Sequence, residues 1–538
     1  MSSLSVPAGA KPFDSFAEAE QTAWALARRY AVPRRMIEQA AERRAAGDWR
    51  GACAAADVDV EIDPAHLTPD LEDDLRHLAP DLLRWHLPRF ASESCLIVPH
   101  RALLLGEYGG RTLHVLTPPS REAPQRLRLR LGTPPGDGPP GSHAVVAAED
   151  WAGHRCLWDA RHTAGLRTRY GGDRVPGFRA DGAPLTGREL PDGAPGRDDP
   201  VVFAEWVRSL QERGEFEAAL GAVGLAEVCA EPGTSDRDWA QLLGAMRADL
   251  TLLAREIARL REAGVPGAVL WTHAKPRLTL TLDDLRLHRE APPGAEGAPC
   301  VPLAAWQRHP DLALLHDGRL APEDLHPLVR DALFPERPPA ERPVGPPDPT
   351  APEPLRVRCQ GEKHLVVLRK GRLEVPHTPE EQRREEALRA LGGAVSGCTA
   401  VVLAWKDGWG WLPRELREQV RDLFLRAQHG DTAGVLWLLD AGVDAHVRGT
   451  RRRTLLHHAH LLDHRALLPR LLEAGLDIDV PDADGRTALQ VMVREHGSAD
   501  AVRALVEAGA NTRVTEADGR PLSEWARRLG RTDLDFLP

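Results

Sequence analysis

The chain has 538 residues, of which 42% are hydrophobic and 28% charged, as is typical of a globular protein with buried cores. Its 79 acidic and 69 basic residues leave a formal net charge of −10, which excludes a generic nucleic-acid binder. The opening MSSLSVPAGAKPFDSF lacks the apolar core of a signal peptide, and no apolar run is long enough to span a membrane. The seven scattered cysteines contain no CxxC pair, which predicts neither a disulfide framework nor a zinc ribbon. We therefore expect a cytoplasmic protein without a membrane segment.

Residues 1–334 predict a mixed region, which we divide into an α+β part at 1–195 and a mostly helical part at 196–334. Proline interrupts the first helical patterns, so that helices are expected over 16–30 and 34–47 and on both sides of Pro80. Strand patterns follow at 95–108, 112–118 and 126–132, and Gly109-Gly110 indicates a hairpin. Further expected elements are helical segments near 150–168 and 200–222, a long helix over 236–264 and strands within 268–282.

Prolines dominate residues 335–354, PERPPAERPVGPPDPTAPEP, which predicts an extended, semi-rigid linker. Residues 355–412 then predict a small α/β unit. We expect strands at 356–360, 364–375 and 398–412 around a helix at 380–393.

Beyond residue 415 the sequence repeats itself. LDAGVDAHV (439–447), LEAGLDIDV (472–480) and VEAGANTRV (506–514) recur 33 and then 34 residues apart. Between them, RRTLLHHAH (452–460) and GRTALQVMV (485–493) are also 33 residues apart, and DGRPLSEWA (518–526) is a weaker copy. Each copy predicts two short helices, followed by a glycine where the backbone turns left-handed: Gly442, Gly475 and Gly509.

These copies resemble the ankyrin-repeat family. DADGRTAL (482–489) and EAGAN (507–511) are close to its motifs, whereas TLLHHA has Leu455 where the family has proline. The resemblance implies about four repeats, at 415–447, 448–480, 481–514 and a truncated 515–538. The expected fold class is a multidomain α+β protein that ends in an all-α ankyrin solenoid. The whole chain is also similar to actinobacterial ankyrin-repeat proteins with an uncharacterised N-terminal region, a similarity that names no activity.

The stretch TLLHHAHLLDH (454–464) contains four histidines, a residue type common in metal and catalytic sites. The ankyrin resemblance implies instead that several of these residues are structural. In that family the histidine of the TPLH motif forms hydrogen bonds within its own turn and to the neighbouring repeat. The implied structural residues are Thr454, His457, His464, Gly485 and Thr487. His458 is expected to be solvated on the concave side. His460 stands where the family has a small residue, and its role stays open.

Motifs of known chemistry are absent from the sequence. There is no GxxxxGK[ST], GxSxG, HExxH or EF-hand pattern. HRE (288–290) with Pro299-Cys300 resembles part of a zinc deaminase signature, but Leu303 replaces its second cysteine. HRCLWDARH (154–162) combines His, Cys and Asp at spacings that arise by chance on a helix. We predict no catalytic residue, no metal site and no cofactor.

The predicted function is binding of another protein through the concave face and hairpin tips of the ankyrin repeats. The candidate contact residues are Arg448, Arg451, Arg452, Arg453, His458, Asp482 and Asp484. The basic tip at 448–453 would meet an acidic patch on the partner, or it would be an ordinary solvated loop. The alternative is an enzyme or toxin in residues 1–334 that uses the repeats for targeting. A cleft with convergent titratable groups there would favour that alternative. The net charge disfavours nucleic-acid binding through the arginine tip.

Overall fold

The computed structural model describes residues 14–90, 95–135, 147–187, 189–196, 198–225, 247–270, 278–283, 285–288, 298–369, 372–391, 396–407, 410–516 and 519–538. The chain divides into two compact units, one of Met1–Arg121 with Arg126–Pro347 and one of Glu122–Gln125 with Asp348–Pro538. Among the described helices, none is long and apolar enough to cross a membrane.

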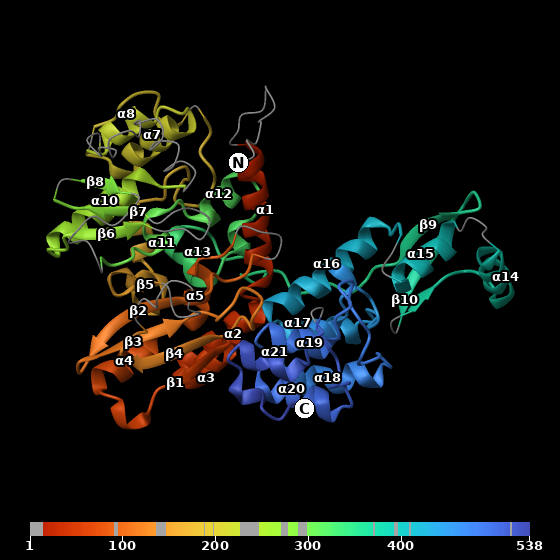
Figure 1. Cartoon of the computed structure of the whole chain (residues 1–538). Helices are drawn as coiled ribbons and strands as arrows, with labels where there is room; N and C mark the ends of the chain where they lie inside the picture. Colours follow the sequence, from red (N-terminus) through yellow and green to blue (C-terminus); the bar gives the residue numbers. More distant parts are fainter. Residues whose placement is uncertain are drawn as a thin grey trace. The chain divides into compact units, whose positions relative to one another are not determined.

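The first unit begins with a series of helices, several of which start at or directly after a proline (Figure 1). They are α1 (Asp14–Tyr30), α2 (Arg34–Ala45), α3 (Trp49–Ala55), the 3-10 turn η1 (Pro64–His66), α4 (Pro69–His77) and α5 (Pro80–His86). Pro33 precedes α2 and Pro80 starts α5, because proline is tolerated in the first turn of a helix but not in its interior. The expected interruptions of the helical pattern are therefore confirmed.

A five-stranded mixed sheet lies at the centre of this unit. Its strands are β1 (Val58–Glu61), β2 (Arg101–Tyr108), β3 (Arg111–Leu116), β4 (Leu127–Gly132) and β5 (Ala147–Asp150), in the order β1-β4-β3-β2-β5. The three central strands are antiparallel, and β1 and β5 pair parallel to β4 and β2 at the edges. Gly109 and Gly110 form the predicted turn between β2 and β3, both with positive φ.

The remainder of this unit combines short helices with a second sheet. Its helices and turns are η2 (Ala152–Leu157), η3 (Ala160–His162), α6 (Gly165–Thr168), α7 (Pro200–Glu212), α8 (Phe216–Ala222), α10 (Leu250–Glu262), α11 (Leu303–Trp306), α12 (Pro310–His316), η4 (Pro322–Asp324) and α13 (Pro327–Leu333). The strands β6 (Gly267–Leu270), β7 (Leu278–Thr281) and β8 (Arg286–His288) form an antiparallel sheet. The strands expected within 268–282 correspond to β6 and β7, so the region at 196–334 combines its helices with a three-stranded sheet.

Two of the expected elements in this region differ from the structure. The helix expected over 236–264 begins only at Leu250, where Asp249 caps it, and residues 236–246 lie outside the described residues, as do 271–277. The packing does not divide this region into two domains near residue 195. Side chains of α12 and α13, among them Leu315 and Val329, belong to the same core as Trp85 and Trp158.

The proline-rich segment is only partly a linker. Its first half is bound to η4 by ion pairs, Arg337 Nε to Glu323 Oε1 at 2.6 Å and Arg342 Nη2 to Asp324 Oδ1 at 2.6 Å. The Gly345 N–H also donates to the Glu323 carbonyl oxygen at 2.8 Å. The expected linker at 335–354 therefore shortens to the few residues around the unit boundary at 347–348.

The second unit starts with a small sheet. The strands β9 (Leu355–Cys359), β10 (Glu362–Arg369) and β11 (Arg372–Glu374) form antiparallel pairs in the order β11-β10-β9. The helix α14 (Pro379–Ala390) follows, as predicted. The strand expected at 398–412 is wrong, because α15 (Gly397–Asp407) is a helix that lies beside β9 (Figure 1). Its buried residues Cys398, Val401, Ala404 and Trp405 recur at helical spacing, which a short apolar run does not reveal.

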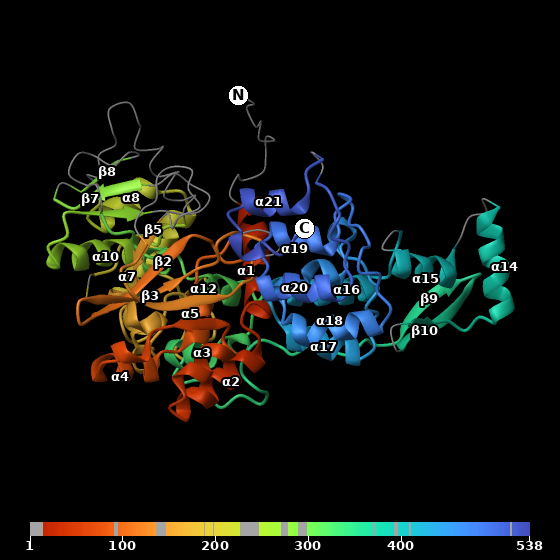
Figure 2. The same cartoon turned by 60° about the horizontal axis from the view of Figure 1, so that its bottom comes forward.

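Four successive helix pairs complete the second unit and lie next to one another in both views (Figures 1 and 2). They are α16 (Arg414–His429) with α17 (Thr432–Asp440), η6 (Leu455–Leu461) with α18 (His464–Glu473), α19 (Ala488–Arg494) with α20 (Ala499–Glu507), and α21 (Leu522–Arg528) with η7 (Thr532–Leu534). Gly442, Gly475 and Gly509 each follow the second helix of a pair with positive φ, where an L side chain would be strained. Leucine, valine and alanine side chains of successive pairs share one core.

Candidate functional site

The basic and acidic hairpin tips of neighbouring repeats contact each other. The segment that carries the arginines, residues 448–453, connects α17 to η6, and the segment 481–487 connects α18 to α19. The Ala483 N–H donates to the Arg451 carbonyl oxygen at 2.7 Å, and Arg451 Nη1 lies 3.3 Å from Asp484 Oδ2. The two tips therefore neutralise part of each other's charge.

Asp482 is an internal residue of its loop. Its carboxylate accepts hydrogen bonds from the backbone N–H groups of Asp484 (2.8 Å) and Arg486 (3.0 Å), and Arg453 Nε lies 3.3 Å from it. Burial opposes ionisation of this carboxyl, but these hydrogen bonds outweigh it and lower the pKa of Asp482. Asp482 is 5% exposed, so the expectation that it contacts a partner is replaced by a structural role.

The exposed charge of the basic tip belongs to two adjacent arginines. Arg451 and Arg452 are exposed, whereas the side chain of Arg453 is 11% exposed and faces Asp482. Both exposed arginines have φ of 57°, in the left-handed region that non-glycine residues rarely adopt. Such backbone strain persists where the surrounding structure imposes it.

Thr454 and His457 form a closed set of hydrogen bonds at the start of η6. His457 Nδ1 lies 3.2 Å from the Thr454 nitrogen and 3.0 Å from its hydroxyl oxygen, as in a capping box. The opposite ring nitrogen, Nε2, lies 3.1 Å from the Arg486 carbonyl oxygen in the next repeat. Thr487 and Gln490 form the corresponding box in that repeat. His457 thus makes both kinds of contact that the ankyrin resemblance implies.

His458 and His460 are buried rather than solvated. His458 is 6% exposed and its ring lies 5.4 Å from that of Phe424 in α16, so the expectation of a solvated concave-face residue is wrong. His460 is 5% exposed, and its Nε2 lies 3.3 Å from the Glu122 carbonyl oxygen in the short segment grouped with this unit. Burial lowers the pKa of His458 well below its usual range and that of His460 to about 4. Both rings are therefore neutral at physiological pH.

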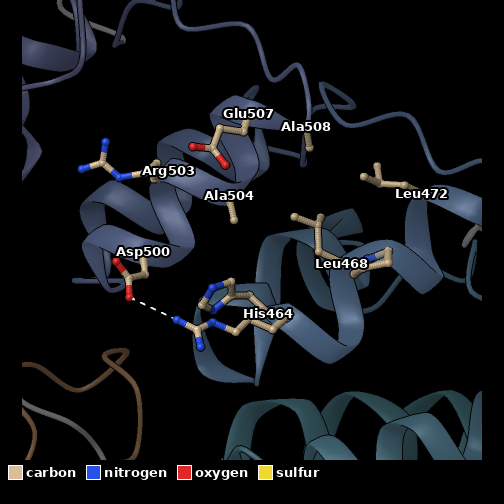
Figure 3. A pocket seen from close by; sticks show the side chains of 10 residues that line it. His464, Leu468, Leu472, Asp500, Arg503, Ala504, Glu507 and Ala508 are labelled. Carbon is tan, nitrogen blue, oxygen red and sulfur yellow. Dashed lines mark ion pairs between the residues drawn. The ribbon is translucent and has the colours of Figure 1, made fainter.

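His464 lies in a groove between α18 and α20 (Figure 3). The groove has a volume of about 530 Å³, and an ion pair between Arg465 and Asp500 at 3.5 Å crosses it. Its other lining side chains are largely aliphatic or charged and come from the second helices of two repeats: Leu468, Pro469, Leu472, Arg503, Ala504, Glu507 and Ala508. His464 begins α18 directly after the capping Asp463, so it stands at a helix start.

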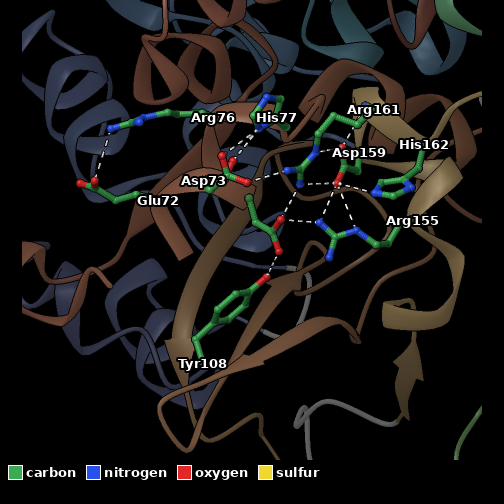
Figure 4. Close-up of polar contacts among 10 residues, drawn as sticks. Glu72, Asp73, Arg76, His77, Tyr108, Arg155, Asp159, Arg161 and His162 are labelled. Carbon is green, nitrogen blue, oxygen red and sulfur yellow. Dashed lines mark hydrogen bonds and ion pairs between the residues drawn. The ribbon is translucent and has the colours of Figure 1, made fainter. Parts of the chain in front are cut away.

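The first unit contains a dense cluster of titratable groups, which Figure 4 shows. Asp74 receives hydrogen bonds from Arg155, Arg161 and the hydroxyl of Tyr108, and Arg155 also lies 2.6 Å from Asp159. Burial favours the neutral carboxyl, yet the bonds from Arg155, Tyr108 and Arg161 outweigh it and lower the pKa of Asp74 to about 2. The pKa of Asp159 is lowered in the same way by its arginines.

These carboxylates remain ionised and paired at neutral pH. A general acid or base needs a pKa near the working pH, so this cluster is suited to holding α4 against η2 and η3 rather than to proton transfer. The cluster therefore gives no support to an enzyme in residues 1–334.

The structure also brings together four side chains that sequence analysis did not connect: Cys359, His364, His377 and Cys398. In the sequence they are separated by 4, 12 and 20 residues. Because the cysteines contain no CxxC pair, the sequence did not predict a zinc site here. The signal available in the sequence was the presence of two cysteines and two histidines within forty residues of one small unit.

Comparison with known families supports the repeat assignment. A family model described as Ankyrin repeats (3 copies) matches residues 423–516. No curated protein matches the chain. The chain therefore carries ankyrin repeats in the second unit, over a minority of its length.

Proposed function

We propose that this chain is a cytoplasmic protein-binding protein whose ankyrin repeats form a solenoid that recognises an acidic surface on another protein. The match of three ankyrin repeats at 423–516 is the observation that carries the proposal, because this family commonly binds proteins. Stacked helix pairs offer an extended surface without reacting groups, which suits recognition. The six cysteines of the described residues are free and buried, in keeping with a reducing compartment.

The tip residues Arg451 and Arg452 provide the positive charge of this recognition surface. Both are exposed, and a loop of the next repeat holds their backbone through the Ala483–Arg451 hydrogen bond. An exposed pair of guanidinium groups on a hydrogen-bonded backbone suits bidentate bonding to carboxylates. The ion pair between Arg453 and Asp482 connects this tip to the loop of the next repeat.

The test begins with isolation of the partner on the full chain and its identification by mass spectrometry. Arg451→Asn together with Arg452→Asn then removes two charges while keeping a residue that tolerates the left-handed backbone. Binding of the variant should be at least about tenfold weaker, and the difference should shrink at high salt because exposed charges are screened.

The control is Arg414→Gln with Arg417→Gln on α16, which changes the net charge by the same amount at exposed positions. Equal affinity of the tip variant and the wild type, or equal weakening by the control, would exclude the tip as the recognition surface.

A further inference from the structure

The four side chains noted above converge at one end of the small sheet, on separate elements. Cys359 ends β9, and His364 lies in β10, where it pairs with Val357, two residues before Cys359. His377 precedes α14, and Cys398 lies in the first turn of α15. Their candidate ligand atoms all lie within 4.8 Å of one another.

The distances among these atoms agree with the edges of a metal-centred tetrahedron. Zinc bonds of about 2.3 Å to sulfur and about 2.0 Å to nitrogen place tetrahedral ligands about 3.3–3.8 Å apart. The Cys359 Sγ to His377 Nε2 distance is 3.5 Å, Cys398 Sγ to His364 Nδ1 is 3.6 Å, and His364 Nδ1 to His377 Nε2 is 3.2 Å. Three of the six distances among the donors therefore agree with tetrahedral zinc coordination, and the others do not exceed 4.8 Å.

The outer ring nitrogens of both histidines face carboxylates. His377 Nδ1 lies 3.8 Å from Glu381 Oε2, and His364 Nε2 lies 3.7 Å from Glu362 Oε2. A carboxylate at the far nitrogen of a ligating histidine fixes its tautomer and increases its basicity. Glu381 is itself held by the Thr378 N–H at 2.8 Å, so its position is set by the start of α14.

The backbone leaves room for the two cysteines to approach. Gly397 has φ of 61°, and a Cβ at this position would lie 2.5 Å from Cys359 Sγ. Any larger residue would therefore displace one cysteine from the other. The glycine thus permits the close approach of α15 to Cys359.

The small sheet and α15 contribute a few residues to the core that they share with the helix pairs of this unit. The buried apolar residues of its strands and of α15, other than the cysteines, are Leu355, Val357, Val366, Leu368, Val401, Ala404 and Trp405. The helix α14 is exposed on nearly all sides and presents Leu388 and Leu391 to solvent. A metal ion held by ligands on the strands and on α15 would stabilise the arrangement of these elements.

From these observations we infer that Cys359, His364, His377 and Cys398 bind one zinc ion that holds β9, β10 and α15 together. Two sulfur and two nitrogen donors in tetrahedral array select zinc among the common divalent metals. Four protein ligands leave no open coordination position, so the zinc is structural and not catalytic. This site is independent of the proposed recognition tip, and it departs from the expectation of no metal drawn from the cysteine pattern.

The test is elemental analysis of the purified full-length chain after metal removal, addition of zinc and desalting. The wild type should retain about one zinc per chain. Cys359→Ser with Cys398→Ser should reduce retained zinc about tenfold or more, whereas Cys53→Ser with Cys300→Ser, at buried cysteines of the first unit, should leave it unchanged. Cobalt added to the metal-free wild type should give the visible bands of tetrahedral Co²⁺ and a thiolate-to-cobalt charge-transfer band.

A second variant keeps the inference testable if the double cysteine variant does not fold. Glu381→Gln preserves the capping interaction with Thr378, because glutamine also serves at this position, but it removes the carboxylate beside His377. Zinc affinity should fall about tenfold, and the neighbouring Glu380→Gln should have no effect. Retention of no zinc by the wild type, a disulfide between Cys359 and Cys398, or the absorption of an iron–sulfur cluster would overturn the inference.

Discussion

At the scale of single residues, burial decides what the histidines of 454–464 do. His457 is held by hydrogen bonds at both nitrogens, whereas His458 packs on Phe424 and His460 lies in a site that lowers its pKa to about 4. A histidine whose folded pKa is depressed takes up protons more readily when unfolded. Its contribution to the free energy of unfolding is therefore complete above about pH 6.5 and is lost as the pH falls.

Replacement of His458 by leucine should make the second unit less sensitive to acid. Between about pH 6.5 and 5, the free energy of unfolding of the wild type should fall relative to His458→Leu by about 1.4 kcal/mol per pH unit, the slope for one proton. Chemical denaturation of the full chain over this range measures the difference. Burial raises the pKa of Glu495 to about 7, so this residue makes the free energy of unfolding rise as the pH falls. The contribution is the same in both proteins and cancels in the comparison.

His446→Leu provides the control, because His446 is exposed beside Asp444 in the same unit. A difference between wild type and His458→Leu that does not vary with pH would show that folding does not lower the pKa of His458.

At the scale of elements, neighbouring acidic residues of one hairpin tip have different roles, one within the loop and one at its surface. Asp482 and Asp484 are two residues apart in the same tip, yet Asp482 organises the loop and Asp484 is partly exposed at its surface. Both residues were candidate partner contacts because the sequence does not show which of the two carboxylates forms hydrogen bonds within the loop. The same limit explains α15, whose apolar run fits a strand or a buried helix until the packing of Cys398, Val401 and Trp405 is known.

Removal of the Asp482 side chain should therefore destabilise the second unit. Asp482→Ala leaves two partly buried backbone N–H groups and Arg453 without their acceptor, at a cost of about 3 kcal/mol. Asp484→Ala, which loses only exposed ion pairs, should change stability by less than about 0.5 kcal/mol. Denaturant unfolding of both variants measures these two losses of stability. Equal losses would contradict the structural role of Asp482 and the surface position of Asp484.

At the scale of the whole molecule, the chain consists of two units with separate cores that meet in sequence at Pro347 and Asp348. The first unit depends on buried charge pairs, among them Arg101 and Glu149, whose Nη1 and Oε1 atoms are 3.1 Å apart and almost fully buried. Glu149 also accepts a hydrogen bond from Trp151 Nε1 at 2.9 Å. The second unit depends on stacked repeats and, in our inference, on zinc.

The two units should consequently respond to separate perturbations. Glu149→Ala removes the carboxylate that the buried Arg101 guanidinium faces and should cost about 3–5 kcal/mol in the first unit. Hydrogen exchange followed by mass spectrometry should show faster exchange in peptides of β2, β3 and β5, with peptides of α16–α20 unchanged. Faster exchange in both units would show that they unfold together.

The sequence by itself determined the periodic features of this protein: the repeats and their glycines, the proline-limited helices α2 and α5, and the β2–β3 hairpin. Each depends on local backbone chemistry or on a fixed period, which neighbouring residues carry. Only the tertiary structure decided which polar side chains face inward. The burial of His458 and Asp482 and the meeting of Cys359, His364, His377 and Cys398 depend on contacts between distant segments. The four histidines first drew attention as a possible metal site, but the donors with metal geometry lie elsewhere, because coordination requires convergence in space and not proximity in sequence.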